Sequence, residues 1–140
     1  MIREFKIDDL ETVMKIWLET NIEAHNFIDK SYWQENFNMV EEMLPVSKIY
    51  VYETNHIIQG FIGLMDSYIA GIFINANSQS MGIGRDLLDY VKDKCTELHL
   101  QVYKKNLRAV QFYLRENFLV SNEQIDEGTG EVELVLNWSK

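Results

Sequence analysis

The sequence predicts an α+β fold in which helices flank a mixed, mostly antiparallel sheet. Runs rich in β-branched and aromatic residues, typical of strands, alternate with segments whose apolar residues recur at helical spacing. The chain has 140 residues, which is enough for one domain with a sizeable core and too few for two ordinary ones. Its only proline is Pro45, and neither a repeat nor a linker divides it, so we expect a single domain over residues 1–140.

The N-terminal part predicts an edge strand followed by a helix. Ile2 to Phe5 is a short apolar opening, and Asp8 with Glu11 three residues later resembles a capping box. Apolar residues at helical spacing follow this cap, namely Leu10, Val13, Met14 and Trp17. Residues 21–30 show no clear period, and we expect them to be irregular.

A second helix and a run of strands make up the middle of the chain. Ser31 with Gln34 is another cap signature, and the helical stripe behind it ends at Pro45. Trp17 and Trp33 both lie on apolar stripes, so core packing is the favoured interpretation for each. Strands are then expected over residues 48–53, 57–65 and 68–74.

The C-terminal part alternates between the two kinds of element. Helices are expected over residues 82–96 and 107–116, and strands over 98–103, 118–125 and 132–138. The last two strands are expected to form a hairpin around Gly128-Thr129-Gly130. The predicted order is therefore β-α-α-β-β-β-α-β-α-β-β.

The chain is acidic, with 13 Lys and Arg against 22 Asp and Glu and a formal net charge of −9. Because such a surface repels phosphate backbones and anionic headgroups, we expect neither nucleic acid nor a membrane as a partner. The single cysteine, Cys95, excludes an intrachain disulfide, and the charged start is unlike a signal peptide, so a cytoplasmic location is expected. His25, His56 and His99 are scattered, which argues against a metal site.

The most informative stretch begins where the strand over 68–74 ends. After a polar connection, Gly82 and Gly84 open a helix. Without Cβ atoms, their amides can approach a ligand closely, and the first helical turn adds unpaired donors and the positive end of a dipole. This combination suits a pyrophosphate, and Arg85 is placed to add a charge-assisted contact. A plain turn is the alternative for a glycine pair considered alone.

Two other phosphate-binding motifs do not match this stretch. A P-loop requires Lys and then Ser or Thr after its second glycine, whereas Arg85 and Asp86 follow Gly84. A dinucleotide fingerprint requires a third glycine and a parallel βαβ unit near the start of its domain. Neither requirement is met.

A second motif opens the helix expected over 107–116, and the two motifs together resemble the GNAT superfamily of acetyl-CoA-dependent N-acetyltransferases. Gln79, Gly82 and Gly84 match the family's [Gln/Arg]-x-x-Gly-x-[Gly/Ala] loop. The family's Asn-x-x-Ala-x-x-Phe-Tyr segment is matched by Asn106, Ala109, Phe112 and Tyr113. The predicted element order agrees with that family over nearly the whole chain.

A narrower resemblance is to small bacterial members that acetylate amines, including protein lysines. The residues that carry it are Trp17, His25-Asn26-Phe27-Ile28, Tyr32-Trp33 and Asn137-Trp138-Ser139. Two positions depart from the family pattern. Ser80-Met81 stand where the loop often has basic residues, and Asn117 stands where a glycine is usual. Lys104 and Lys105 are candidates to supply the missing charge near the adenosine phosphate.

The resemblance implies direct attack of a substrate amine on the thioester of acetyl-CoA, without a metal. It implies that Tyr113 donates a proton to the leaving sulfur, a role that suits a phenol protonated at neutral pH. On the residues alone, Tyr113 would be interpreted as a core side chain. Glu23, His25 and Asp66 are candidates for the base that deprotonates the amine, and an ordered water is the alternative to all three.

The resemblance also implies an acetyl-CoA-binding set. The strand end would pair with the pantetheine amides through its main chain, the loop would hold the pyrophosphate, and Asn106 would bond the pantetheine arm while also serving as a helix N-cap. The set comprises Ile72, Phe73, Ile74, Gln79, Ser80, Met81, Gly82, Ile83, Gly84, Arg85, Asn106, Ala109 and Phe112.

Two functions remain open at this point. One is an N-acetyltransferase that acts on a small-molecule amine, a protein lysine or an N-terminus, with Phe27, Tyr32 and Tyr103 as candidate walls of an amine channel through cation–π contacts. The other is a non-catalytic acyl-CoA-binding or sensing domain. Tyr113 favours the enzyme, because a binding domain needs no acid at that position. The sequence leaves open the acceptor amine and the choice between monomer and homodimer.

Overall fold

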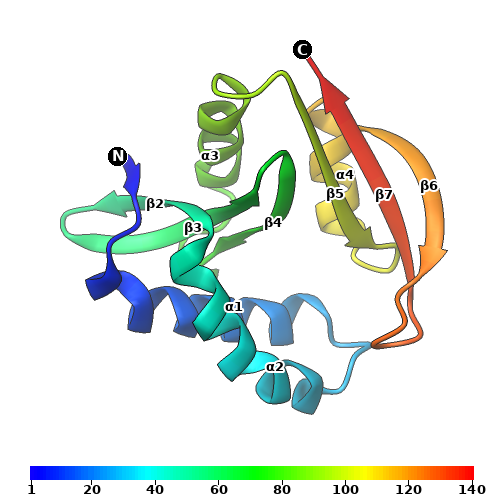
Figure 1. Cartoon of the computed structure of the whole chain (residues 1–140), viewed down its shortest axis with the longest axis horizontal. Helices are drawn as coiled ribbons and strands as arrows, with labels where there is room; N and C mark the ends of the chain where they lie inside the picture. The colour runs from blue at the N-terminus through cyan, green and yellow to red at the C-terminus, as the bar shows by residue number, and fades with distance from the viewer.

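A computed structural model describes all residues 1–140 and contains one seven-stranded sheet with helices on both of its faces (Figure 1). The strand order is β1-β2-β3-β4-β5-β7-β6, and every neighbouring pair is antiparallel except β4 and β5. The α+β class and the element order predicted from the sequence are confirmed. None of the helices combines the length and apolarity that crossing a membrane would require.

The element bounds agree closely with the sequence patterns. The strands are β1 (Ile2–Glu4), β2 (Lys48–Thr54), β3 (Ile57–Met65), β4 (Tyr68–Ile74), β5 (Glu97–Tyr103), β6 (Leu119–Ile125) and β7 (Val132–Ser139). The helices are α1 (Leu10–Ala24), α2 (Lys30–Met43), α3 (Ile83–Lys92) and α4 (Leu107–Arg115), with short 3-10 turns at Ile7–Asp9, Leu44–Val46 and Ala76–Ser78.

Both predicted caps at the first two helices were displaced. The N-cap of α1 is Asp9, not Asp8, and it makes no side-chain cap bond to α1; its carboxylate instead accepts the Lys6 N–H at 2.8 Å across the 3-10 turn that precedes the helix. Asp29, not Ser31, caps α2 and accepts the Ser31 N–H at 2.9 Å. The expected irregular segment is also shorter than 21–30, since α1 continues through Ala24.

The sheet separates two hydrophobic cores. On one face, α1 and α2 bury Val13, Met14, Trp17 and Trp33 against β2 and β3, which confirms the core interpretation of both tryptophans. On the other face, α3 and α4 pack on the central strands. The fully buried residues there include Ile62, Leu87, Leu88, Leu100, Phe118 and Leu136.

The two halves of the sheet separate between β4 and β5. These parallel strands pair only through Tyr68 with His99 and Ile69 with Leu100. Directly after Ile69, the register of β3 against β4 shifts, so that Ala70 forms a bulge. A bulge bends its strand and increases the local twist, and here it turns the rest of β4 away from β5. Figure 1 shows the two strands diverging from their paired ends.

Candidate active site

A cleft of about 740 Å³ is lined by the end of α1, the free end of β4, the loop before α3, and the helices α3 and α4. Most of the predicted site residues line it: Glu23, His25, Ile72, Phe73, Ile74, Gln79, Ser80, Gly82, Ile83, Gly84, Arg85, Asn106, Ala109, Phe112 and Tyr113. Seven predicted residues do not line it: Phe27, Tyr32, Asp66, Met81, Tyr103, Lys104 and Lys105. Met81 is 67% exposed, so its side chain is turned to solvent.

The loop before α3 has the backbone that the glycine pattern predicts. Gly82 adopts a φ of 81°, in the left-handed region that favours glycine, and no side chain caps the first amides of α3. A Cβ on Gly84 would meet only ordinary contacts, with Phe112 at 3.6 Å and Ile72 at 3.9 Å. Internal packing therefore does not require a glycine at 84, whereas a ligand close to the backbone would.

The cationic groups of the cleft differ from those expected. Lys104 and Lys105 are not part of its lining; they pair with Glu123 at 2.6 Å and Glu131 at 3.1 Å. Arg85 lines the cleft as expected, and Arg108 and Arg115, which the sequence did not single out, line it as well.

Arg108 links α4 to the loop before α3 through hydrogen bonds. Its guanidinium donates to Gln79 Oε1 at 2.7 Å and to Ser80 Oγ at 3.0 Å, and Gln79 Nε2 donates in turn to the Ile74 carbonyl at 3.1 Å. Arg108 is exposed, so these bonds contribute little to stability and the guanidinium is accessible from solvent. The arginine therefore places a planar, bidentate cation beside the free amides of α3.

Tyr113 lies on α4 with its ring packed edge-on against Phe118 at 5.5 Å between centroids. It is only 7% exposed, yet it contributes to the cleft lining. Burial raises the pKa of its phenol, with the nearby Tyr68 as a smaller cause. The hydroxyl therefore keeps its proton at neutral pH and remains a hydrogen-bond donor.

The three candidate bases occupy different environments. Glu23 lines the cleft and is exposed at the end of α1. His25 also lines it but is half-buried, and burial lowers the pKa of its imidazole. Asp66 lies in the turn between β3 and β4, outside the cleft lining.

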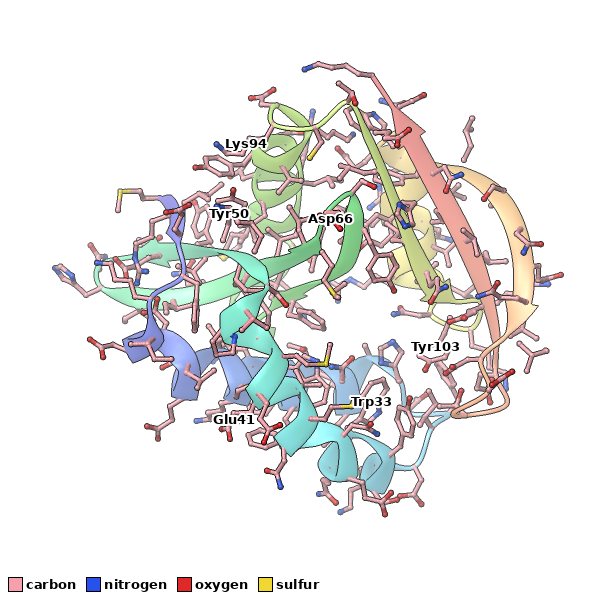
Figure 2. The ribbon with its side chains drawn as sticks, in the orientation of Figure 1. Trp33, Glu41, Tyr50, Asp66, Lys94 and Tyr103 are labelled. Carbon is pink, nitrogen blue, oxygen red and sulfur yellow. The ribbon has the colours of Figure 1, made fainter.

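The predicted aromatic residues form a cluster beside the cleft. The His25 ring stacks on Trp33 at 5.1 Å and meets Tyr103 and Phe27 edge-on at 5.1 Å and 5.8 Å. Figure 2 shows Trp33 on α2 and Tyr103 at the end of β5 approaching each other. Tyr32 joins the cluster through Trp33, at 5.0 Å.

Several lining residues were not found from the sequence. They are Thr20, Asn21, Ala24, Ser78, Arg108, Arg115 and Glu116. Asn21 and Ala24 belong to the segment expected to be irregular, and its helical continuation directs them toward the cleft. Arg108 had a usable signal, because it lies between Asn106 and Ala109 of the matched motif, on the first turn of α4.

Comparison with known proteins agrees with this geometry. The model of the acetyltransferase (GNAT) domain family matches residues 18–132. The chain belongs to the GNAT acetyltransferase family. The expected relationship is thus confirmed, and the protein is an acetyl-CoA-dependent N-acetyltransferase that takes an amine as acceptor. The non-catalytic alternative is not favoured.

Individual relatives extend over nearly the whole chain. Peptidyl-lysine N-acetyltransferase YiaC of Escherichia coli is 29% identical over 99% of this chain and 96% of its own length. The solution structure of apo YjaB from E. coli has 26% identity and a TM-score of 0.87, covering 99% of this chain and 96% of that one. A Salmonella typhimurium acetyltransferase, yncA, solved with acetyl-CoA, shares the fold at 14% identity and a TM-score of 0.69, with 99% and 92% coverage.

Arg108→Ala is expected to weaken acetyl-CoA binding about tenfold. A hydrogen bond to a charged group contributes about 1.5–3 kcal/mol, and the exposure of Arg108 to solvent places its contribution at the lower end of that range. Isothermal titration calorimetry measures the dissociation constant directly. Lys104→Ala is the matched control, since it removes one positive charge near α4 but outside the cleft. Equal weakening by both substitutions would mean that net charge, and not the position of Arg108, governs affinity.

Proposed function

We propose that this acetyltransferase transfers the acetyl group to the side-chain amine of lysine residues in proteins. The observation that carries the proposal is the aromatic and acidic surface beside the cleft, which already holds a lysine of the chain itself. Lys105 Nζ lies 5.6 Å from the centroid of the Phe27 ring. Tyr103, which contacts that ring at 5.9 Å, donates a 2.7 Å hydrogen bond to Asp126. Aromatic faces with a nearby carboxylate suit a lysine ammonium.

Two further facts support this acceptor. The formal net charge of −9 favours the approach of a cationic substrate over an anionic one. The relatives YiaC and YjaB, similar over almost their full lengths, are both described as peptidyl-lysine N-acetyltransferases. Phe27, Tyr32 and Tyr103 remain the proposed substrate-side residues.

The residues of the cleft fit acetyl-CoA. Beyond Ile69, β4 has no strand partner on its β5 side, so the backbone there can pair with the amides of pantetheine once the Ile74 carbonyl gives up its bond from Gln79 Nε2. The first amides of α3 and the three arginines suit the phosphates. Asn106 caps α4 with its Oδ1, which accepts the backbone N–H of Ala109. Its side-chain NH₂ group therefore points away from the start of the helix. When bound, acetyl-CoA supplies an acetyl thioester to the acceptor amine.

The acceptor amine must lose a proton before it attacks. For a lysine of pKa about 10.4 at pH 7, removing that proton costs about 4.6 kcal/mol. Glu23 is the exposed carboxylate in the cleft lining, and we propose that it accepts the proton through a water molecule. Asp66 lies too far along the sheet to share this task, since it does not reach the cleft.

Tyr113 is the proposed donor to the departing sulfur. Because its pKa is raised, its proton stays on the oxygen until negative charge develops on sulfur, and the bond then strengthens. Its Oη would thus donate a hydrogen bond to the thiolate as the carbon–sulfur bond breaks, and the phenol would regain from solvent any proton that leaves with CoA.

A peptide series tests the acceptor. The substrates are an Nα-acetylated peptide with one central lysine, its Lys-to-Arg counterpart, the same Arg peptide with a free N-terminus, and spermidine. Turnover confined to the lysine peptide, measured as CoA release and as one added acetyl group by mass spectrometry, is expected. Transfer to the free N-terminus or to spermidine without transfer to the lysine peptide would refute the lysine proposal.

Tyr113→Phe is expected to lower kcat by about 100-fold, the lower end for a positioned proton donor, while the dissociation constant of acetyl-CoA stays within about twofold. Stopped-flow or steady-state CoA release gives kcat, and calorimetry gives the affinity. Tyr90→Phe is the matched control, because Tyr90 is a half-buried tyrosine of α3 that does not line the cleft. An unchanged kcat in Tyr113→Phe would remove the phenol from the reaction.

A further inference from the structure

A series of hydrogen bonds through His25 joins the end of α1 to the start of α4. His25 Nδ1 lies 3.0 Å from the Asn21 carbonyl oxygen, and its Nε2 lies 3.2 Å from Asn106 Nδ2. Asn106 Oδ1 in turn accepts the backbone N–H of Ala109 at 3.3 Å, as the N-cap of α4. His25 and Asn106 are 81 positions apart in the chain, and both line the cleft.

These partners assign the protonation state of the imidazole. A carbonyl oxygen only accepts, so Nδ1 must carry a hydrogen. Asn106 cannot rotate its amide without losing the cap on Ala109, so its NH₂ group faces Nε2 and donates to it. Nε2 must then be unprotonated. All three bonds form together only with a neutral His25 in the Nδ1–H tautomer.

We propose that His25 is a positioning residue that orients Asn106 and the first turn of α4, and that it is not the base of the reaction. The lone pair a base would need, on Nε2, is already occupied by Asn106. The link joins the two walls of the cleft, and α4 carries Tyr113 on its inner side. This role rests on the proposed function, since it concerns the alignment of the same acetyl-transfer site.

The surroundings of His25 favour the neutral form. Its ring is enclosed by Trp33 from α2, Tyr103 from β5 and Phe27 from the connecting segment. The charged groups that contact two of these aromatic rings are paired: Lys105, over the Phe27 ring, pairs with Glu131 at 3.1 Å, and Asp126 accepts from Tyr103. On its own helix, Glu23 is exposed to solvent, and no salt bridge joins it to His25.

The link consequently depends on pH in a defined direction. A protonated imidazole would direct Nε2–H at the Asn106 NH₂ group, so either this bond breaks or Asn106 rotates and uncaps α4. Burial lowers the pKa of His25 in the folded protein. The link is therefore complete above the ordinary histidine pKa of about 6.5 and is lost as the pH falls through the lower, folded value.

Asn106→Asp tests the link without relying on activity. Aspartate is as good an N-cap as asparagine, so α4 keeps its cap, but the carboxylate cannot donate to Nε2 and instead favours a protonated ring. Nitrogen-15 NMR of the imidazoles should show the Nδ1–H tautomer of His25 in the parent protein. In the variant, the pKa of His25 should rise above about 6.5. An Nε2–H tautomer in the parent, or an unchanged pKa in the variant, would overturn the proposal whatever the acceptor substrate is.

His25→Phe separates positioning from catalysis, because it keeps an aromatic ring in the cluster and removes both nitrogens. A positioning role predicts that acetyl-CoA affinity and kcat/KM each fall about 3- to 10-fold, the size of one net hydrogen bond. It also predicts that the part of the acidic decline of kcat/KM that His25 is expected to cause in the parent protein is absent from the variant. A fall in kcat of about 100-fold or more with unchanged acetyl-CoA affinity would identify a base and overturn the proposal.

Discussion

The separation of β4 from β5 is the constraint on which the rest of the site depends. Two parallel pairs, at Tyr68 and Ile69, hold the halves of the sheet together, and the bulge at Ala70 then turns β4 away. A buried strand edge without a partner would leave polar backbone groups unsatisfied. Along Ile72–Ile74 this edge borders an open cleft, so water or a ligand with amide groups can take the place of a neighbouring strand.

The divergence is tolerated because each half of the sheet has its own support. One core, under α1 and α2, stabilises the N-terminal strands, and the other, under α3 and α4, spans the junction through residues such as Leu100 and Tyr113. The helices that cover the junction also line the cleft. The start of α3 presents unpaired amides, and α4 brings Arg108, Asn106 and Tyr113 to one cleft. Packing and function therefore depend on the same two helices.

Local patterns in the sequence were sufficient for the element order and for most of the residues that line the cleft. The glycines at 82 and 84 and the segment from Asn106 to Tyr113 each lie within a few residues, so spacing alone placed them on the correct turns. Helix starts were harder to locate, because Asp8 and Asp9, or Asp29 and Ser31, are candidate caps only one or two positions apart. Only the backbone path decides between such neighbours.

Contacts between distant segments could not be predicted from spacing. The pairing of Lys104 with Glu123 depends on how β6 folds back beside β7, which in turn pairs with β5, and it withdraws a cation that the sequence suggested for the cofactor. The bond between His25 and Asn106 likewise appears only once α1 and α4 are placed. In both examples, residues distant in the sequence but close in the fold determine where a charge or a proton lies.

Amide hydrogen exchange with and without acetyl-CoA tests the use of the divergent strand edge most directly. Saturating acetyl-CoA is expected to slow exchange in the segment from Ile72 to Ile74 and in the first turn of α3, while exchange in β6 and β7 stays unchanged. Protection confined to β6 and β7, or no protection at the end of β4 despite measurable binding, would contradict the account.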